Sequence, residues 1–163
     1  MTTYDFQDGQ GPVAAHRHTN GGGWVADTAS VAETAEVSGN AKVYGNAIVS
    51  GNAWVYGNAW VSGGAKVSGN AWVSGNAEVS GNAKVSGNAK VYAVVLTANR
   101  SDGYTFAIFK EHDGTVCITA GCRFFTIPEA IEHWTNTRGG TKLGVESIAL
   151  VHHLEYMMNL QEE

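Results

Sequence analysis

Valine recurs at every sixth position from Val25 to Val91, and no other feature of the sequence constrains the fold as strongly. From Val31 onward an alanine stands two residues before each valine, and from Val37 to Val85 a glycine stands two residues after it. Asparagine follows each of these glycines except Gly63. A chain of merely low complexity does not hold twelve valines in one phase, so residues 24–92 predict a repeat architecture.

The chemistry of the repeat unit V-S-G-N-A-x predicts how it folds. Alanine, x and valine form a short strand in which alanine and valine face inward. Glycine and asparagine then turn the chain, because both tolerate positive φ. Three such sides make a triangular coil of eighteen residues, and coils stack about 4.8 Å apart as parallel strands. The prediction is a mainly β protein with a parallel β-helix of about four coils, a filled core, and asparagine ladders at its corners.

Composition excludes several other classes of protein. The chain has 163 residues, with 21 glycines but only 2 prolines, so it is not collagen. It is 44% hydrophobic with a net charge of −5, which argues against disorder. It shows no apolar run of membrane-spanning length and no signal-peptide pattern at its N-terminus. We therefore expect a soluble, cytoplasmic protein with no membrane partner. The low isoelectric point, about 5.6, and the lack of a basic stripe disfavour nucleic acid as a partner.

A period of eighteen sorts the outward residues of the predicted helix onto three faces. Aromatic side chains fall on two of them: Trp54, Tyr56, Trp72 and Tyr92, together with Lys90, on the first, and Trp24, Tyr44 and Trp60 on the second. The third face is polar and carries Lys66 and Lys84. Monomers rarely leave such aromatic stripes in water. We expect either an oligomer interface or a dock for the C-terminal segment; the sharper alternative is a platform on which bases or sugars stack.

Residues 1–23 are expected to cap the first coil. His16 and His18 alternate along an extended segment, so both are predicted to point the same way, close to Asn20. One interpretation is that they hydrogen-bond the cap to the first coil. The other is an anion or metal site, in which six imidazoles could gather around a threefold axis. Which metal such a site would hold is unknown.

Residues 93–163 abandon the period and predict a small α+β module. Strands are expected at 94–97, 104–110 and 115–119, with a hairpin turn at 112–114 and a break at 121–122. Thr126 and Glu129 form a capping box ahead of a helix at 127–136, and a second helix is expected at about 145–158. Cys122 fits a buried small apolar residue better than a nucleophile.

The repeat unit resembles the hexapeptide-repeat, left-handed parallel β-helix family. That resemblance implies a left-handed coil and a homotrimer with parallel axes. The stretches 11–29, with its H-R-H-T-N-G-G-G motif, and 120–134 resemble end segments of uncharacterised hexapeptide-repeat proteins of phages and bacteria. Phe124 and Phe125 depart from the smaller, turn-like sequence expected there.

These features favour a non-catalytic trimeric binding protein without a cofactor. Its clefts, lined by tryptophan and tyrosine and flanked by Lys66, Lys84 or Lys90, would suit a nucleotide-like ligand. A phage-encoded protein of this kind could sequester a signal of host immunity or block a host protein. The alternative is a structural trimeric stalk or virion-associated protein. A hexapeptide acyltransferase is the second alternative, but no histidine lies between Trp24 and Tyr92 to serve it.

Overall fold

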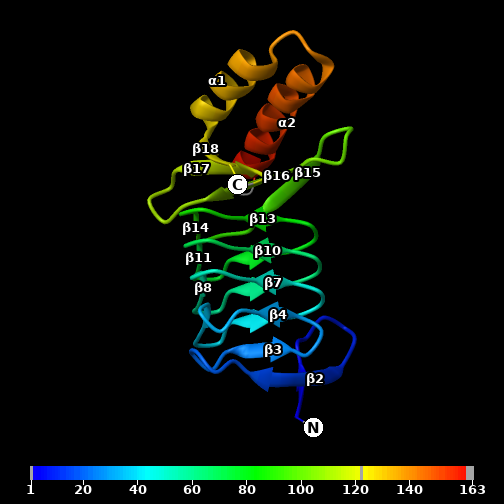
Figure 1. The fold of residues 1–163 in the computed structure, drawn as a ribbon, viewed down its shortest axis with the longest axis vertical. Helices are drawn as coiled ribbons and strands as arrows, with labels where there is room; N and C mark the ends of the chain where they lie inside the picture. Colours follow the sequence, from blue (N-terminus) through cyan, green and yellow to red (C-terminus); the bar gives the residue numbers. More distant parts are fainter. Residues whose placement is uncertain (1, 122, 161–163) are drawn as a thin grey trace.

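The computed structural model describes residues 2–121 and 123–160 and shows a stack of coils with a different cap at each end (Figure 1). The first strands are β1 (Thr3–Asp5), β2 (Pro12–Arg17) and β3 (Trp24–Ala26). Short strands then follow at six-residue intervals: β4 (Ser30–Val31), β5 (Glu36–Val37), β6 (Lys42–Val43), β7 (Ile48–Val49), β8 (Trp54–Val55), β9 (Trp60–Val61), β10 (Lys66–Val67), β11 (Trp72–Val73), β12 (Glu78–Val79), β13 (Lys84–Val85) and β14 (Lys90–Val91).

These strands form three parallel ladders, one for each side of the coil. The ladders run β3-β6-β9-β12, β4-β7-β10-β13 and β5-β8-β11-β14. Residues pair across a spacing of eighteen, as Trp54 does with Trp72 and Lys42 with Trp60. The predicted parallel β-solenoid of about four coils and its three faces are therefore confirmed. Its left-handedness stays an expectation from the resemblance.

The bore of the solenoid is packed with valine and alanine. From Ala35 to Val91 every inward alanine and valine is at most 1% exposed. Side chains of two sizes therefore fill the interior completely, as the repeat predicts. The bore is a filled core with no room for a ligand. Any binding site of the solenoid must therefore lie on one of its three outer faces.

Glycine at the corners meets two requirements. Gly51 has a φ of +69°, and a Cβ added there would lie 2.8 Å from the carbonyl oxygen of Gly69 in the next coil. Gly87 shares the left-handed φ, at +72°, but a Cβ there would meet nothing within 4 Å. The predicted asparagine ladder is present at one corner over three coils, where Asn58 accepts from Asn40 and donates to Asn76 at 3.1 and 3.2 Å, and a single such bond joins Asn70 to Asn88 at another.

Antiparallel strands β1 and β2 close the lower end: β1 pairs with β2, and β2 pairs with β3. The turn after β2 approaches the first coil closely: a Cβ on Gly21 or Gly23 would lie under 3 Å from Val37. The N-G-G-G run therefore lets the cap lie directly on the first coil. This contact explains why glycine is needed at both positions.

A four-stranded antiparallel sheet closes the upper end. Its strands are β15 (Leu96–Asn99), β16 (Thr105–Lys110), β17 (Val116–Ala120) and β18 (Arg123–Thr126), in that order. One face packs Ala107, Phe109 and Cys117 onto the solenoid core. The other packs Phe106 and Ile108 against the helices α1 (Ile127–Arg138) and α2 (Lys142–Asn159). The sheet is thus the middle layer between coils and helices (Figure 1).

Several details of the upper end differ from expectation. Strand β17 ends at Ala120, as the predicted break requires, but Gly121, with a φ of +65°, is followed by a further strand, β18, that was not predicted. The first strand runs from Leu96 to Asn99, two residues later than predicted, and Val94 is 42% exposed. Helix α2 starts at Lys142, three residues earlier than predicted, since Thr141 accepts a hydrogen bond from the Gly144 N–H. Cys122 lies outside the described residues.

None of the helices in the described part of the chain is long and apolar enough to cross a bilayer.

Candidate functional site

The two aromatic faces predicted from the repeat differ in what covers them. On the second face, the ring of Trp24 stacks on Tyr4 at 4.3 Å, and Tyr44 stacks on Phe6 at 5.0 Å. On this face, the alternative that the C-terminal segment docks there is wrong, because the N-terminal segment occupies it. The N-terminal strand covers this face, whereas the C-terminal module sits on the end of the solenoid.

A lysine completes that covered face. Lys42 is only 8% exposed; its Nζ lies 4.7 Å from the centre of the Trp60 ring and donates to Gln7 Oε1 at 3.2 Å. Its charge is thus held between an aromatic ring and the N-terminal segment. The second aromatic face is therefore an internal contact between the N-terminal segment and the solenoid of the same chain.

The first aromatic face has no such cover. Trp54, Trp72 and Tyr92 are 42%, 37% and 47% exposed. The parallel register stacks Trp54 on Trp72 with ring centres 5.1 Å apart and planes inclined by 2°. We call Trp54, Tyr56, Trp72 and Tyr92 the aromatic stripe. It runs along the solenoid axis, because equivalent positions of successive coils lie directly above one another.

A cleft of about 650 Å³ lies at the upper end of this stripe. Trp72 forms part of its wall, with the Tyr56 ring edge-on at 6.5 Å and Lys90 Nζ 5.6 Å from the ring centre. His112, from the β16–β17 hairpin, packs edge-on against Tyr92 at 5.0 Å. The cleft thus combines flat aromatic surfaces with one lysine and one imidazole.

The structure separates the three lysines of the predicted site. Lys90 lies beside the stripe, but Lys66 and Lys84 pair with each other on the third face, above Ile48. Within one chain they do not flank the aromatic cleft. The residue that sequence reasoning missed there is His112, because only the packing of the hairpin onto the last coil brings it to Tyr92.

The cap residues His16, His18 and Asn20 make separate contacts. The exposed His16 bonds Asp27 Oδ1 through Nδ1 at 2.8 Å. His18 is 6% exposed, and its Nε2 lies 3.0 Å from the carbonyl oxygen of Ala35, which also accepts from Asn20 at 3.1 Å. The expected hydrogen bonds between cap and first coil are present. Within residues 2–121 and 123–160, no three metal-ligating side chains are clustered.

Cys117 is packed at the junction of solenoid and module, where it is 1% exposed. Burial raises the pKa of its thiol to about 12, and nearby carboxylates, Glu111 first, act in the same direction. The thiol therefore stays protonated at neutral pH and is a poor nucleophile.

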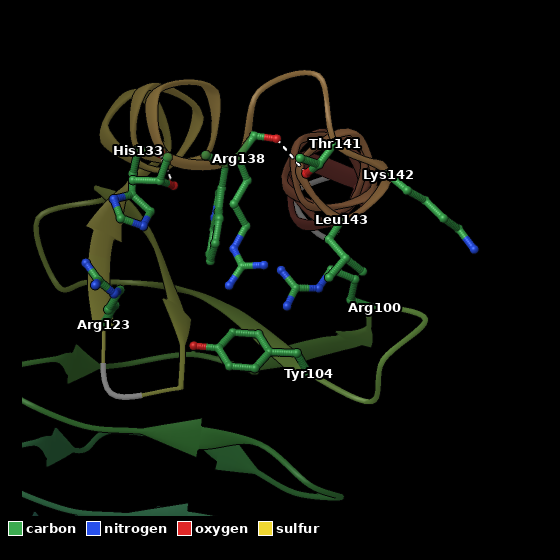
Figure 2. A pocket seen from close by; sticks show the side chains of 10 residues that line it. Arg100, Tyr104, Arg123, His133, Arg138, Thr141, Lys142 and Leu143 are labelled. Carbon is green, nitrogen blue, oxygen red and sulfur yellow. Dashed lines mark hydrogen bonds between the residues drawn. The ribbon is translucent and has the colours of Figure 1, made fainter.

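A second cavity, of about 720 Å³, lies in the C-terminal module between α1, α2 and the sheet (Figure 2). Arg100, Arg123, His133 and Arg138 line it. Sequence reasoning did not identify this cluster, since the four residues follow no common spacing. Only the fold of the module gathers them.

Part of the repeat is similar to a known family. Residues 41–57 and 49–63 match the family described as the YdcK beta solenoid repeat. No curated protein and no solved structure matches the chain. The matched residues form the coils that carry Trp54 and Tyr56, so the comparison supports a β-solenoid repeat in the region of the aromatic stripe.

Proposed function

We propose that this chain is a non-catalytic binding protein that forms a homotrimer and binds a nucleotide-like ligand beside the aromatic stripe. The observation that carries the proposal is the cleft at the upper end of the stripe. There Trp72 and Tyr92 offer exposed rings, and Lys90 places a positive charge next to them.

The chemistry of the cleft suits a planar ring that bears an anionic group. Aromatic side chains stack on flat heterocycles with any pattern of hydrogen-bonding groups. Lys90 is exposed and extends over the edge of this surface, so its ammonium group can reach an anion attached to the ring. His112 adds a second polar group from the hairpin.

The lower part of the stripe suits a second copy of the chain. Trp54 is 42% exposed in a row of parallel rings, and rings of this size are usually covered by a partner. Because the second face is already covered by the N-terminal strand, the stripe of one copy would meet the upper coils of its neighbour around a threefold axis. The ligand cleft then lies at the edge of this interface.

The resemblance of the end segments to phage proteins extends the proposal. A phage-encoded trimer would work in the cytoplasm of the host cell, where it would hold an immune signal of nucleotide type or mask a host protein without turning it over.

A structural stalk is the second candidate function. Antiparallel strands cover both ends of the solenoid: β2 pairs with β3 below, and β16 and β17 lie against β13 and β14 above. The cap at each end therefore stands in the way of coils from successive copies stacking end to end. This disfavours a fibre, while a short spacer stays compatible with the fold. A hexapeptide-type transferase is the third candidate; its interface histidine would have to come from outside the coils.

The test of the binding proposal compares the wild-type protein with the double variant Trp54→Ser/Trp72→Ser. Light scattering at micromolar concentration should give the mass of three chains for the wild type and a smaller mass for the variant. The control is Ile48→Ser, which removes an exposed apolar side chain from the third face and should leave the trimer intact.

The ligand arm uses adenosine monophosphate as the probe. Quenching of tryptophan fluorescence should be saturable, and Lys90→Gln should weaken it because the phosphate loses its cation. A wild-type monomer would refute the trimer, and quenching that is absent or unchanged in Lys90→Gln would refute the ligand site.

A further inference from the structure

The C-terminal module concentrates its positive charge in one cavity. Residues 93–163 contain nine acidic residues and only five lysines and arginines. Four of those five cations, Arg100, Arg123, Arg138 and Lys142, line the 720 Å³ cavity between α1, α2 and the sheet. In the described part of the chain, none of the residues lining it is acidic. The cavity is therefore lined by basic residues although the segment that forms it is acidic overall.

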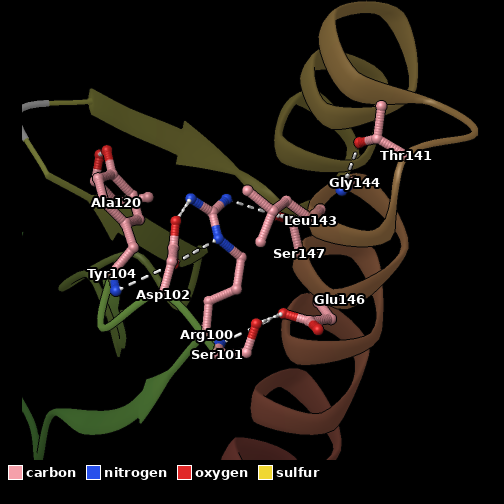
Figure 3. A network of polar contacts seen from close by, with 10 residues as sticks. All are labelled: Arg100, Ser101, Asp102, Tyr104, Ala120, Thr141, Leu143, Gly144, Glu146 and Ser147. Carbon is pink, nitrogen blue, oxygen red and sulfur yellow. Dashed lines mark hydrogen bonds and ion pairs between the residues drawn. The ribbon is translucent and has the colours of Figure 1, made fainter.

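Arg100 is fully engaged within the protein (Figure 3). It is 5% exposed and grips Asp102 with two hydrogen bonds of 2.9 and 2.8 Å, while its third nitrogen donates to Ser147 at 2.9 Å. Its guanidinium also lies 4.9 Å from the centre of the Tyr104 ring. Asp102 neutralises this charge, so Arg100 forms a fixed wall of the cavity.

Arg123 and Arg138 have no such partner. No carboxylate of residues 2–121 and 123–160 forms a described ion pair with either guanidinium. Figure 2 shows the Arg138 side chain extending from α1 toward the space above Tyr104, and Arg123 rising from β18 below His133. Burial and the charge of Arg123 lower the pKa of His133, so the imidazole adds no further charge at neutral pH. Two guanidinium groups that form no ion pair within residues 2–121 and 123–160 thus approach the cavity from different elements.

Two more groups, on residues that line the cavity, have no hydrogen-bond acceptor among residues 2–121 and 123–160. Trp134 is 5% exposed, and its indole Nε1 is buried without a hydrogen-bond acceptor among the described residues. Such orphaned buried donors are rare in folded proteins. The cavity also borders the first turn of α2, at Lys142 and Leu143, whose N–H groups have no acceptor within the helix. The positive end of the helix dipole adds to the field there.

The packing of the helices holds these groups in place. A Cβ on Gly144 would lie 1.9 Å from the Arg138 carbonyl oxygen, so only glycine lets α2 begin this close to the end of α1. Ser101 donates to Glu146 at 2.6 Å and ties α2 to the end of β15. The cavity is therefore built into the module before any ligand arrives.

We propose that this cavity binds a phosphoryl group of a phosphorylated small molecule. Guanidinium groups recognise phosphate through paired hydrogen bonds. Here two of them and a helix N-terminus border the cavity from different elements, which matches the several oxygens of a tetrahedral anion better than the two oxygens of a carboxylate. The ligand is a separate one from that proposed for the aromatic stripe, and the site needs no second copy of the chain.

The test is isothermal titration calorimetry of the full-length, untagged protein with sodium pyrophosphate at low ionic strength. We expect saturable binding of one pyrophosphate per chain. Arg138→Gln and Arg123→Gln should each weaken it about tenfold, as expected for loss of a charge-assisted contact. Arg138→Lys keeps the charge but not the paired hydrogen bonds and should fall between Arg138→Gln and the wild type. Melting curves confirm that each variant is folded.

The matched control is Lys66→Gln, which removes the same charge from the third face and should leave binding unchanged. A nuclear magnetic resonance spectrum gives a second readout: pyrophosphate should shift the indole N–H signal that Trp134→Phe removes. Absence of saturable binding, equal weakening by Lys66→Gln, or equal binding of acetate would each overturn the proposal. Trp54→Ser/Trp72→Ser should keep pyrophosphate binding, which separates this site from the aromatic stripe.

Discussion

The solenoid and the C-terminal module solve the problem of folding in opposite ways. In the solenoid, the place of a residue in the six-residue unit decides its environment, so Val37 and Val91 are equally buried although they lie three coils apart. In the module, the contacts that hold sheet and helices together join residues far apart in the chain, such as Arg100 with Ser147. Repetition makes the first region readable from its sequence, whereas the second depends on its tertiary packing.

The same contrast governs where functional groups gather. The solenoid repeats any surface residue along its axis, so its aromatic residues form the stripe of Trp54 and Trp72. The module brings unlike residues to one point and produces a basic cavity from an acidic segment. We infer that the solenoid favours extended surfaces and the module favours compact sites.

The largest expected loss of stability comes from a substitution in the core of the C-terminal module, which should leave the coils folded. Phe106 is fully buried between the sheet and the helices, so Phe106→Ala should destabilise the module by about 3–5 kcal/mol. Loss of the helical circular dichroism signal during urea titration would report it. Val67→Ala, in the bore, removes fewer atoms and should cost about 2 kcal/mol. Equal shifts of both regions in both variants would show that they unfold as one unit.

A smaller effect tests the two reasons for corner glycines. Gly51→Ala places a side chain at positive φ and also against the backbone of Gly69. Gly87→Ala places a side chain at positive φ but in open space. We expect about 1–2 kcal/mol of destabilisation for Gly87→Ala. Gly51→Ala should add about 1–3 kcal/mol for crowding between coils. Thermal melting compares them, and equal losses would show that the coils spread apart at little cost.

The smallest expected effect is a loss of stability at low pH, and it should occur in the C-terminal module. Hydrogen bonds from Arg100 lower the pKa of Asp102 to about 2. Because the folded pKa lies below the ordinary 3.8, this carboxylate stabilises the fold above about pH 4 and loses that effect as pH falls toward 2. Hydrogen bonds from Thr126 and Ser101 lower the pKa of Glu129 and Glu146 in the same direction.

Melting curves between pH 7 and pH 2, followed through the helical signal, check this effect. Asp102→Asn should be less stable than the wild type at pH 7 and should lose less stability on acidification. An identical pH profile for the two proteins would contradict the role of the Arg100–Asp102 pair.

The sequence predicted most of the solenoid and little of the sites. Period and residue type sufficed for the filled bore, the corners and the sorting of aromatics onto faces, because each is a local property of the unit. Nothing local shows that Phe6 covers Tyr44, that His112 reaches Tyr92, or that Arg123 and Arg138 share a cavity. Each of those contacts depends on how segments of different kind pack together.

The central claim, that the stripe is a binding surface covered by copies of the chain and a ligand, is tested most directly by native mass spectrometry of untagged protein taken from cells. We expect the mass of three chains plus a reproducible small excess. That excess should be lost in Lys90→Gln, while the three chains remain together. A single-chain mass without any excess would contradict the claim.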